Sequence, residues 1–191
     1  GSLNNHWGVP FSLLNMREAD QFGVIEMGMS NYGEIQRLVE IAEPDVVACT
    51  MVGFAHFEHF GSQENIAKAK NEIYKFSKKE ATRIFNLDDP YVKKMRDDFM
   101  VSNTKGPTLT FSETQRSADI FMKIKHIDSA GLQLEGHIMG KEGSSLVSVF
   151  GRHNLTNILA ASALAAAAGM SPNLIWSSLG TLKTNWGRNQ L

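Results

Sequence analysis

The stretch AHFEHFGSQENIAKAKNEIYKF, residues 55–76, holds a helix pattern and the polar residues around which the rest of the chain is arranged. From Ser62 onward, apolar or small residues recur at i, i+3, i+7 and i+11, which places them on one face of a helix. That face consists of Ile66, Ala69, Ile73 and Ser77. Ser62 is suited to cap the helix, and Glu64 would lie in its first turn, where the helix dipole favours a carboxylate. We therefore predict a helix that begins after Ser62.

Lys70 falls within the packed face of this helix, whereas Lys68 and Lys75 project from the opposite side. An ammonium group turned towards a packed face costs free energy unless a partner or a chemical change removes its charge. The ordinary alternative is a lysine that extends its amine along the helix surface to solvent. A short polar cluster lies just upstream of the helix and consists of His56, Glu58 and His59. A lysine, two histidines and a carboxylate together indicate a site.

Short apolar runs alternate with amphipathic segments over the first half of the chain, which is typical of a parallel α/β sheet. Strands are expected at residues 22–27, 45–50 and 81–86, and helices at 34–41, after Ser62 and from Pro90. Residues 108–150 alternate with period 2, which predicts an antiparallel meander. A helix at 154–168 closes with Gly169, and Pro172 opens a last short helix. The predicted fold class is α/β, a mostly parallel sheet flanked by helices with a small antiparallel meander.

The composition excludes several classes of protein. The 191 residues include 19 basic and 20 acidic side chains, which gives a net charge of −1 and no basic field for nucleic acid. No apolar run is long enough to span a bilayer, so we expect no membrane insertion. The single cysteine, Cys49, rules out an internal disulfide and is expected to be a small buried side chain. We expect a cytoplasmic protein.

Two polar residues lie at or just beyond the ends of predicted strands. Glu26 ends the first predicted strand, and His56 lies just beyond the second. In an open α/β sheet, ligands bind at the carboxyl ends of the strands, so both side chains could converge on one divalent cation. Taken singly, Glu26 is more often a solvated strand end and His56 a packed, hydrogen-bonded histidine. Only their joint placement with Lys70 favours a site.

Asparagines mark two further segments. Asn154 and Asn157 are i, i+3 neighbours at the start of the Ala-rich helix, and two amides can offer the donor and acceptor that a purine edge requires. Asn154 alone is more often a helix cap. The first ten residues, GSLNNHWGVP, include Asn4 and Asn5 and could be only a turn-rich lead into a helix.

Several motifs together resemble a known family. GSLNNHWGVPFSLL, VIEMGMSNYGEI, AHFEHFGSQENIAKAKNEIY, FNLDD and GRHNLTNILAASALA occur in this order. In this order and spacing they resemble the central domain of the Mur ligases, in particular the type that adds D-alanyl-D-alanine to UDP-N-acetylmuramoyl-tripeptide. Folylpolyglutamate synthases share the architecture but match these motifs less well. The resemblance covers nearly the whole chain.

The resemblance implies roles for the candidate residues. Glu26 matches a magnesium-binding glutamate, His56 matches the histidine that holds a second magnesium, and Lys70 matches a lysine that reacts with carbon dioxide to become a carbamate. Magnesium accepts the two oxygens of a carbamate readily. The reaction implied is ATP-dependent amide bond formation through an acyl phosphate, with ATP and Mg²⁺ required.

The resemblance also implies the binding residues. Asn154 and Asn157 match the adenine-contacting region, and Arg188 is assigned to the nucleotide. Asn4 and Asn5 match a loop that contacts the muramoyl-peptide substrate. Glu58 and His59 match no ligand of the family. The residues that select the diamino acid of the tripeptide are expected mainly in another domain.

The chain departs from the family in one respect. The phosphate loop Gly-x-x-x-x-Gly-Lys-Ser/Thr does not occur in residues 1–191. We therefore expect a central domain truncated at its amino terminus, without the amino-terminal UDP-binding and carboxy-terminal domains, and inactive alone. Its sheet is expected to miss a strand, which offers an edge for self-association. The alternatives are a non-catalytic Mur-like binding module, or another ligase of the Mur or folylpolyglutamate type.

Overall fold

A six-stranded sheet runs through the molecule, in a computed structural model that describes residues 3–55, 57–102 and 106–182. The strands lie in chain order from β1 to β6. The first four are parallel to one another, and β4, β5 and β6 are antiparallel. The strands are β1 (Val46–Cys49), β2 (Thr82–Asn86), β3 (Thr108–Ser112), β4 (Ile120–Asp128), β5 (Gly131–Ile138) and β6 (Lys141–Val147). The predicted fold class is confirmed.

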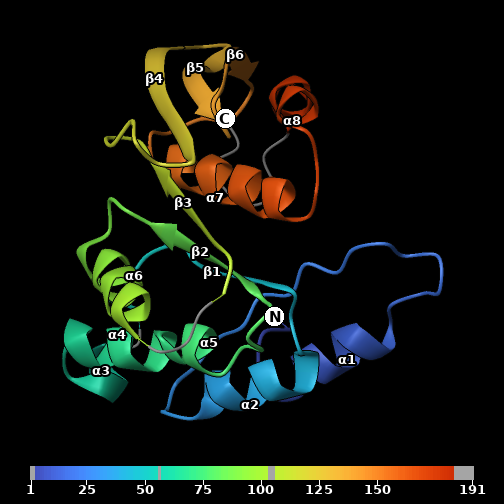
Figure 1. The fold of residues 1–191 in the computed structure, drawn as a ribbon, viewed down its shortest axis with the longest axis vertical. Helices are drawn as coiled ribbons and strands as arrows, with labels where there is room; N and C mark the ends of the chain where they lie inside the picture. Colours follow the sequence, from blue (N-terminus) through green and yellow to red (C-terminus); the bar gives the residue numbers. More distant parts are fainter. Residues whose placement is uncertain (1–2, 56, 103–105, 183–191) are drawn as a thin grey trace.

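Helices cover both faces of the sheet. In Figure 1, β1 and β2 lie between α7 on one side and α5 and α6 on the other. α8 packs against β6, at the antiparallel end of the sheet. The helices of the described residues are α1 (Gly8–Leu14), α2 (Glu34–Ala42), α3 (Phe57–Phe60), α4 (Gln63–Lys70), α5 (Glu72–Lys75), α6 (Pro90–Val101), α7 (Asn154–Ala167) and α8 (Pro172–Leu179).

The alternation of side chains along the strands divides the core into two parts. On β2, the fully buried Ile84 packs into the cluster beneath α7 and α8, whereas its neighbour Phe85 packs into the cluster beneath α2, α4 and α6. Successive residues of a strand point to opposite faces, so β2 contributes to both clusters. β2 lies between β1 and β3 and is buried on both faces, which holds its carboxyl end in place.

The predicted helix after Ser62 is present, but it is divided. Ser62 Oγ accepts from the Asn65 N–H, as the sequence predicted, and the α-helical run breaks at Asn71, between α4 and α5. Asn71 keeps right-handed helical angles, so the break is a small irregularity and the packed face continues across it. Ile66, Ala69 and Ser77 are all buried.

The strand predicted at residues 22–27 is wrong. The segment has no regular secondary structure, and Phe22 and Val24 are 68% and 86% exposed. A strand needs a hydrogen-bonded neighbour, and β1 pairs with β2 alone among the strands of the described residues. The alternation in this segment buries its other side chains only in part: Ile25 and Met27 are partly buried, and Met27 packs against the core beside α2. A backbone bond from the Gly28 N–H to the Asn4 carbonyl, 2.7 Å, fixes its end.

The boundary of the antiparallel part also differs from the prediction. β3 was expected in the meander, but it runs parallel to both β2 and β4. Both kinds of strand can show period-2 alternation, so the pattern alone could not place β3. In the described part of the chain, none of the helices has the length and apolar character needed to cross a bilayer.

Candidate functional site

The segment that follows β1, residues 50–52, is held by side chains from three other elements. Asn86 Nδ2 at the end of β2 donates to the Thr50 carbonyl at 2.8 Å, and Gln63 Nε2 of α4 donates to the Val52 carbonyl at 3.3 Å. The Val52 N–H donates to Asp89 Oδ2 at 2.9 Å. Backbone groups at a strand end need such partners, because no sheet neighbour satisfies them. The carboxyl edge of β1 is therefore a fixed platform.

Lys70 contacts the same platform. Its side chain is half-buried, and Nζ donates to the Met51 carbonyl at 2.9 Å. The sequence predicted an amine turned towards the packed side, and the structure places it against a backbone carbonyl at the margin of the core. This bond is exposed, so the alternative of an amine that extends along the helix surface to solvent stays open for Lys70, whereas Lys68 is an exposed residue.

Cys49 lies beneath this platform as the last residue of β1. Its thiol is buried, and burial raises the pKa of Cys49 to about 11. The positive charge of Lys70 opposes this shift, which reflects how close the two side chains lie. A thiol that stays protonated at neutral pH is a poor nucleophile, so the expectation of a buried, inert Cys49 agrees with the structure.

Glu26 and Asn4 lie together. Asn4 Nδ2 donates to Glu26 Oε1 at 2.9 Å, and the Glu26 side chain is exposed. The sequence assigned these residues to different roles, a magnesium ligand and a substrate contact, and the structure brings them together. Glu26 was expected at a strand end. It lies instead on the irregular segment tied to Asn4.

Asn5 leads into the first helix. Its Oδ1 accepts from the N–H groups of Trp7 and Gly8, at 3.1 and 2.9 Å. These bonds close a turn that leads directly into α1, whose N-cap residue is Trp7. Within the described residues 3–10, the interpretation of a turn-rich lead into a helix is therefore correct, and Asn5 has a structural task whatever else it contacts.

Asn154 and Asn157 lie on the first turn of α7. Asn154 Nδ2 donates to the Phe150 carbonyl at 2.7 Å, and Asn157 Nδ2 donates to Asn154 Oδ1 at 3.3 Å. Asn154 does not cap the helix, since its amide ties the helix start back to the end of the preceding segment. In Figure 1, α7 begins on the left of the molecule, the side towards which the arrow of β2 points. The two asparagines therefore lie towards the carboxyl edge of the parallel strands.

His56 and Arg188 lie outside the described residues. Within the ranges 3–55, 57–102 and 106–182, no group of three histidine, cysteine or acidic side chains lies close enough to hold a metal ion. Glu58 and His59 are part of the short helix α3.

Two acidic residues of the FNLDD motif were not assigned a role from the sequence, and the structure gives each a distinct one. Asp88 accepts from Ser112 Oγ and from the Glu113 N–H, both at 2.6 Å, which joins the ends of β2 and β3. Asp89 caps α6 and contacts Val52. Pro90 at the first helical position was the available signal, since it marks the preceding residue as a cap.

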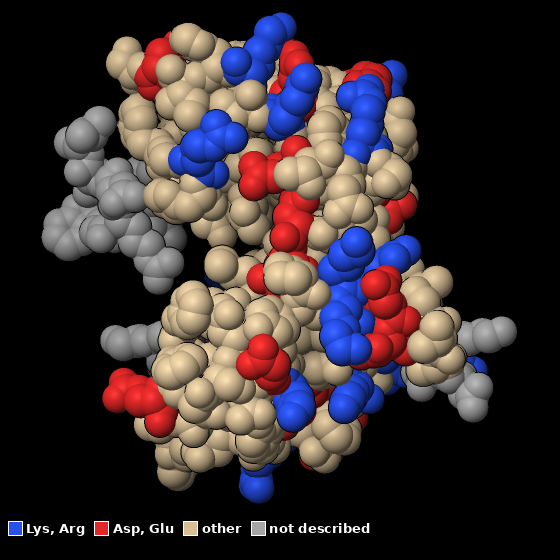
Figure 2. All heavy atoms as spheres, turned by 90° about the vertical axis from the view of Figure 1, so that its left-hand side faces the viewer, with Lys and Arg blue, Asp and Glu red and all other residues tan. Residues whose placement is uncertain are grey.

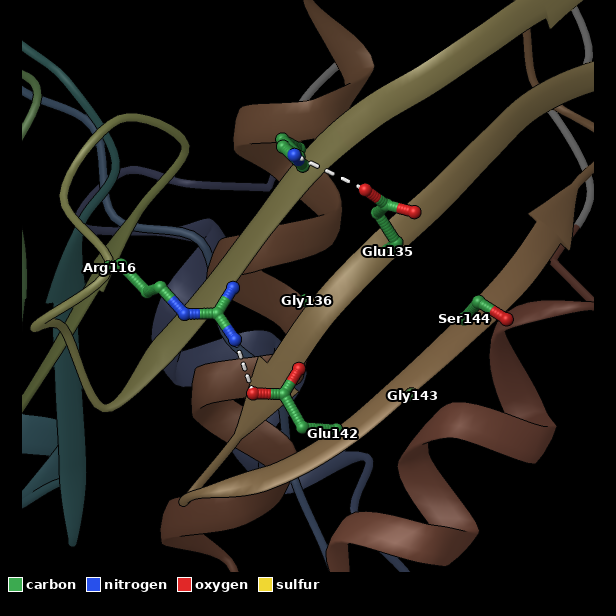
Figure 3. A pocket seen from close by; sticks show the side chains of 7 residues that line it. Arg116, Glu135, Gly136, Glu142, Gly143 and Ser144 are labelled. Atoms are coloured by element: carbon green, nitrogen blue, oxygen red, sulfur yellow. Dashed lines mark hydrogen bonds and ion pairs between the residues drawn. The ribbon is translucent and has the colours of Figure 1, made fainter.

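A hollow of about 390 Å³ lies elsewhere, on the outer face of β4, β5 and β6. Figure 3 shows Arg116 reaching across to Glu142, and Glu135 paired with a side chain of β4. None of the residues predicted from the sequence lines this hollow. Its exposed charges are paired with one another, and such pairs contribute little to stability.

The charged surface gives no single-sign field on the face drawn in Figure 2, where lysines and arginines lie beside aspartates and glutamates. This agrees with the net charge of −1.

The fold defines an α/β domain with a platform of fixed backbone at the carboxyl edge of its parallel strands, and comparison with known families gives its family. Residues 1–165 match the family described as the Mur ligase middle domain, so the chain belongs to the Mur ligase family. It is similar to UDP-N-acetylmuramoyl-tripeptide–D-alanyl-D-alanine ligase of Bacillus subtilis, with 31% identity over 191 residues, 100% of this chain and 39% of the relative. The Escherichia coli protein of the same name is 31% identical over 188 residues, 98% of this chain and 41% of the relative.

Solved structures give the same result. A crystal structure of MurF from Acinetobacter baumannii has a TM-score of 0.88 at 28% identity and covers 98% of this chain and 40% of its own. MurF ligase from Thermotoga maritima, solved in complex with ADP, has a TM-score of 0.81 at 30% identity. The match covers 98% of this chain and 42% of the Thermotoga chain. The chain thus spans about two fifths of the length of these relatives.

Proposed function

We propose that this chain is the central domain of an ATP-dependent ligase that adds D-alanyl-D-alanine to UDP-N-acetylmuramoyl-tripeptide in the cytoplasm, a step of peptidoglycan precursor synthesis. The observation that carries the proposal is the placement of Lys70 against the Met51 carbonyl, at the carboxyl edge of the parallel sheet. The whole chain is similar to ligases of this type. In open α/β sheets, that edge is where ligands bind.

The reaction has two steps. The terminal carboxylate of the tripeptide attacks the γ-phosphorus of ATP, ADP leaves, and an acyl phosphate forms. The amine of D-alanyl-D-alanine then attacks the acyl carbon, phosphate leaves, and the amine loses a proton as the amide forms. The contribution of the protein is mainly to hold the reactants in position and to stabilise the developing charge.

The proposed metal site consists of Glu26, His56 and Lys70. Glu26 offers a carboxylate, which suits magnesium, whereas the amine of Lys70 does not. Reaction of that amine with carbon dioxide forms a carbon–nitrogen bond, releases a proton and leaves a carbamate with two ligand oxygens. Magnesium at this place would neutralise charge on the transferred phosphoryl group.

The proposed binding residues lie on separate elements. Asn154 and Asn157 at the start of α7, with Arg188, would contact the nucleotide. Asn4 and Asn5 would contact the muramoyl-peptide. Because the Asn5 side-chain oxygen already accepts from the N–H groups of Trp7 and Gly8, its NH₂ group is the part that can serve the substrate. We also propose that sequence outside these 191 residues supplies the phosphate loop and the domain that grips the uridine nucleotide.

The test of this function is phosphate release from ATP by the full-length protein with UDP-N-acetylmuramoyl-tripeptide. We expect release that depends on D-alanyl-D-alanine and not on D-glutamate or diaminopimelate. Release that depends on another acceptor would assign a different ligase. A full-length protein that binds the substrates but never releases phosphate would indicate the non-catalytic module.

The role of Lys70 is tested by substitution with rescue. We expect Lys70→Ala to lower the rate by about 100-fold, because it removes a group that organises the metal. Formate or acetate should restore part of the rate, since a free carboxylate can take the place of the carbamate. Lys68→Ala is the matched control, because Lys68 is exposed on the same helix. Equal rates for the two variants would remove Lys70 from the reaction.

A further inference from the structure

Asp89 uses its two carboxylate oxygens for two different tasks. Oδ1 accepts from the N–H groups of Tyr91 and Val92, at 3.0 and 2.9 Å, which caps α6. Oδ2 accepts from the Val52 N–H at 2.9 Å, across 37 residues of sequence. A helix cap needs only the first set of bonds. The second oxygen is therefore available to hold another segment.

The segment that Asp89 holds is the one that positions Lys70. Val52 is the next residue after Met51, and the Met51 carbonyl accepts from Lys70 Nζ. The Val52 N–H that Asp89 holds and the Met51 carbonyl that Lys70 contacts belong to the same planar peptide unit, so a rotation of this unit would move both groups. The Val52 side chain is buried, and Gln63 of α4 holds the carbonyl of the next peptide unit.

We propose that Asp89 is a positioning residue, which through the Val52 N–H sets the Met51 carbonyl and thereby the orientation of the nitrogen of Lys70. The inference rests on the proposed function. A lysine carbamate keeps one N–H on its nitrogen after the carbon dioxide adds. That N–H can continue to donate to the Met51 carbonyl, and the carboxylate of the planar carbamate then points away from it. Asp89 would thus fix the direction in which the carbamate oxygens are presented.

A purely structural cap is the competing explanation, and one substitution separates the two. In Asp89→Asn, the amide oxygen still accepts from Tyr91 and Val92, whereas an NH₂ group replaces the oxygen that faces the Val52 N–H. Two donors then face each other. Asp89→Ser is a second variant, because serine also caps helices and has no atom that reaches Val52. Both variants retain the cap and lose the link.

The matched control is Ser171→Ala, which removes the cap of α8 far from the site. The experiment measures three quantities on the full-length protein: the rate constants with D-alanyl-D-alanine, hydrogen exchange of the Val52 amide, and the carbamate signal in carbon-13 spectra with labelled bicarbonate. Hydrogen exchange and the carbamate signal can both be measured on a protein that is not catalysing the reaction.

We expect both Asp89 variants to lower kcat by about tenfold, with KM for ATP changed less than about threefold, because a misplaced reacting group affects the transition state more than binding. Exchange at Val52 should speed up, and the carbamate signal should need more bicarbonate to saturate. Ser171→Ala should lose stability and keep wild-type values for all three. The inference is overturned if Asp89→Asn keeps wild-type kcat and carbamate signal while Val52 exchange rises. A wild-type protein without ligase activity would instead contradict the proposed function. The positioning role of Asp89 would then still be decided by comparing the carbamate signal of the Asp89 variants with that of the wild type.

Discussion

At the scale of single residues, the side chain of Tyr74 joins the end of β1 to the middle of β2. Tyr74 Oη accepts from the Cys49 N–H at 2.8 Å and donates to the Ile84 carbonyl at 2.6 Å. Burial raises the pKa of Tyr74 well above its ordinary value, so the phenol keeps the proton that it donates. Buried backbone groups without such partners would each cost about 1–3 kcal/mol. Tyr74 therefore stabilises the end of β1, from which the platform at residues 50–52 continues.

The pKa of Cys49 predicts how stability changes with pH. The thiol has a pKa of about 11 in the folded protein against 9.0 ordinarily, so the folded state holds this proton more tightly than the unfolded state. The resulting stabilisation is complete below about pH 9 and is lost as pH rises towards 11. Two pKa units correspond to at most about 2.7 kcal/mol.

Urea unfolding of the wild type and Cys49→Ala at a series of pH values from about 8 to 11 measures this loss. We expect the wild type to lose about 2 kcal/mol more than the variant over this range. Groups that do not interact with Cys49 contribute equally to both proteins and cancel in the difference. Parallel curves for the two proteins would show that Cys49 ionisation is not linked to folding.

At the scale of elements, the end of α7 shows a prediction that the sequence allowed. The Met170 N–H donates to the Ala165 carbonyl and the Gly169 N–H to the Ala166 carbonyl, both at 3.0 Å. This pair of bonds is a Schellman motif, which requires the left-handed conformation of Gly169, φ +90°. Glycine after an alanine-rich run was the signal, because other residues rarely adopt that conformation.

Gly169→Ala is expected to lower the free energy of unfolding by about 1 kcal/mol. An added Cβ at Gly169 would meet nothing within 4 Å, so the loss comes from the backbone alone. Gly180→Ala is the control, because Gly180 has φ −66° and ordinary space around it. Denaturant unfolding of the two variants compares them, and an equal effect would mean that the conformation of Gly169 is not strained for alanine.

Elements that depend on local signals were predictable, and those that depend on a neighbour were not. Caps and prolines located the starts of α4, α6 and α8. Residues 22–27 alternate as a strand does, yet no described strand pairs with them, and the direction of β3 follows from its neighbours. Strand pairing is a long-range property, so periodicity within one segment cannot report it.

At the scale of the whole molecule, the site depends on contacts between distant parts of the chain. Asn4 donates a hydrogen bond to Glu26, 22 residues away in sequence, and Asp89 accepts one from Val52, 37 residues away. The sequence could place Lys70, since helix periodicity is local, and it could give Glu26 and the asparagines roles only through family resemblance. It could not predict the platform at residues 50–52, because no periodic pattern connects its partners. Self-association through the sheet edge stays a prediction.

The most direct test of the central claim, a ligase that works through an acyl phosphate, follows labelled oxygen. The terminal carboxylate of UDP-N-acetylmuramoyl-tripeptide is labelled with heavy oxygen and incubated with the full-length protein, ATP and D-alanyl-D-alanine. Mass spectrometry then measures the released phosphate and the peptide product. We predict one labelled oxygen in the phosphate and the other in the new amide, in equal amounts. Unlabelled phosphate, or phosphate without the extended peptide, would contradict the claim.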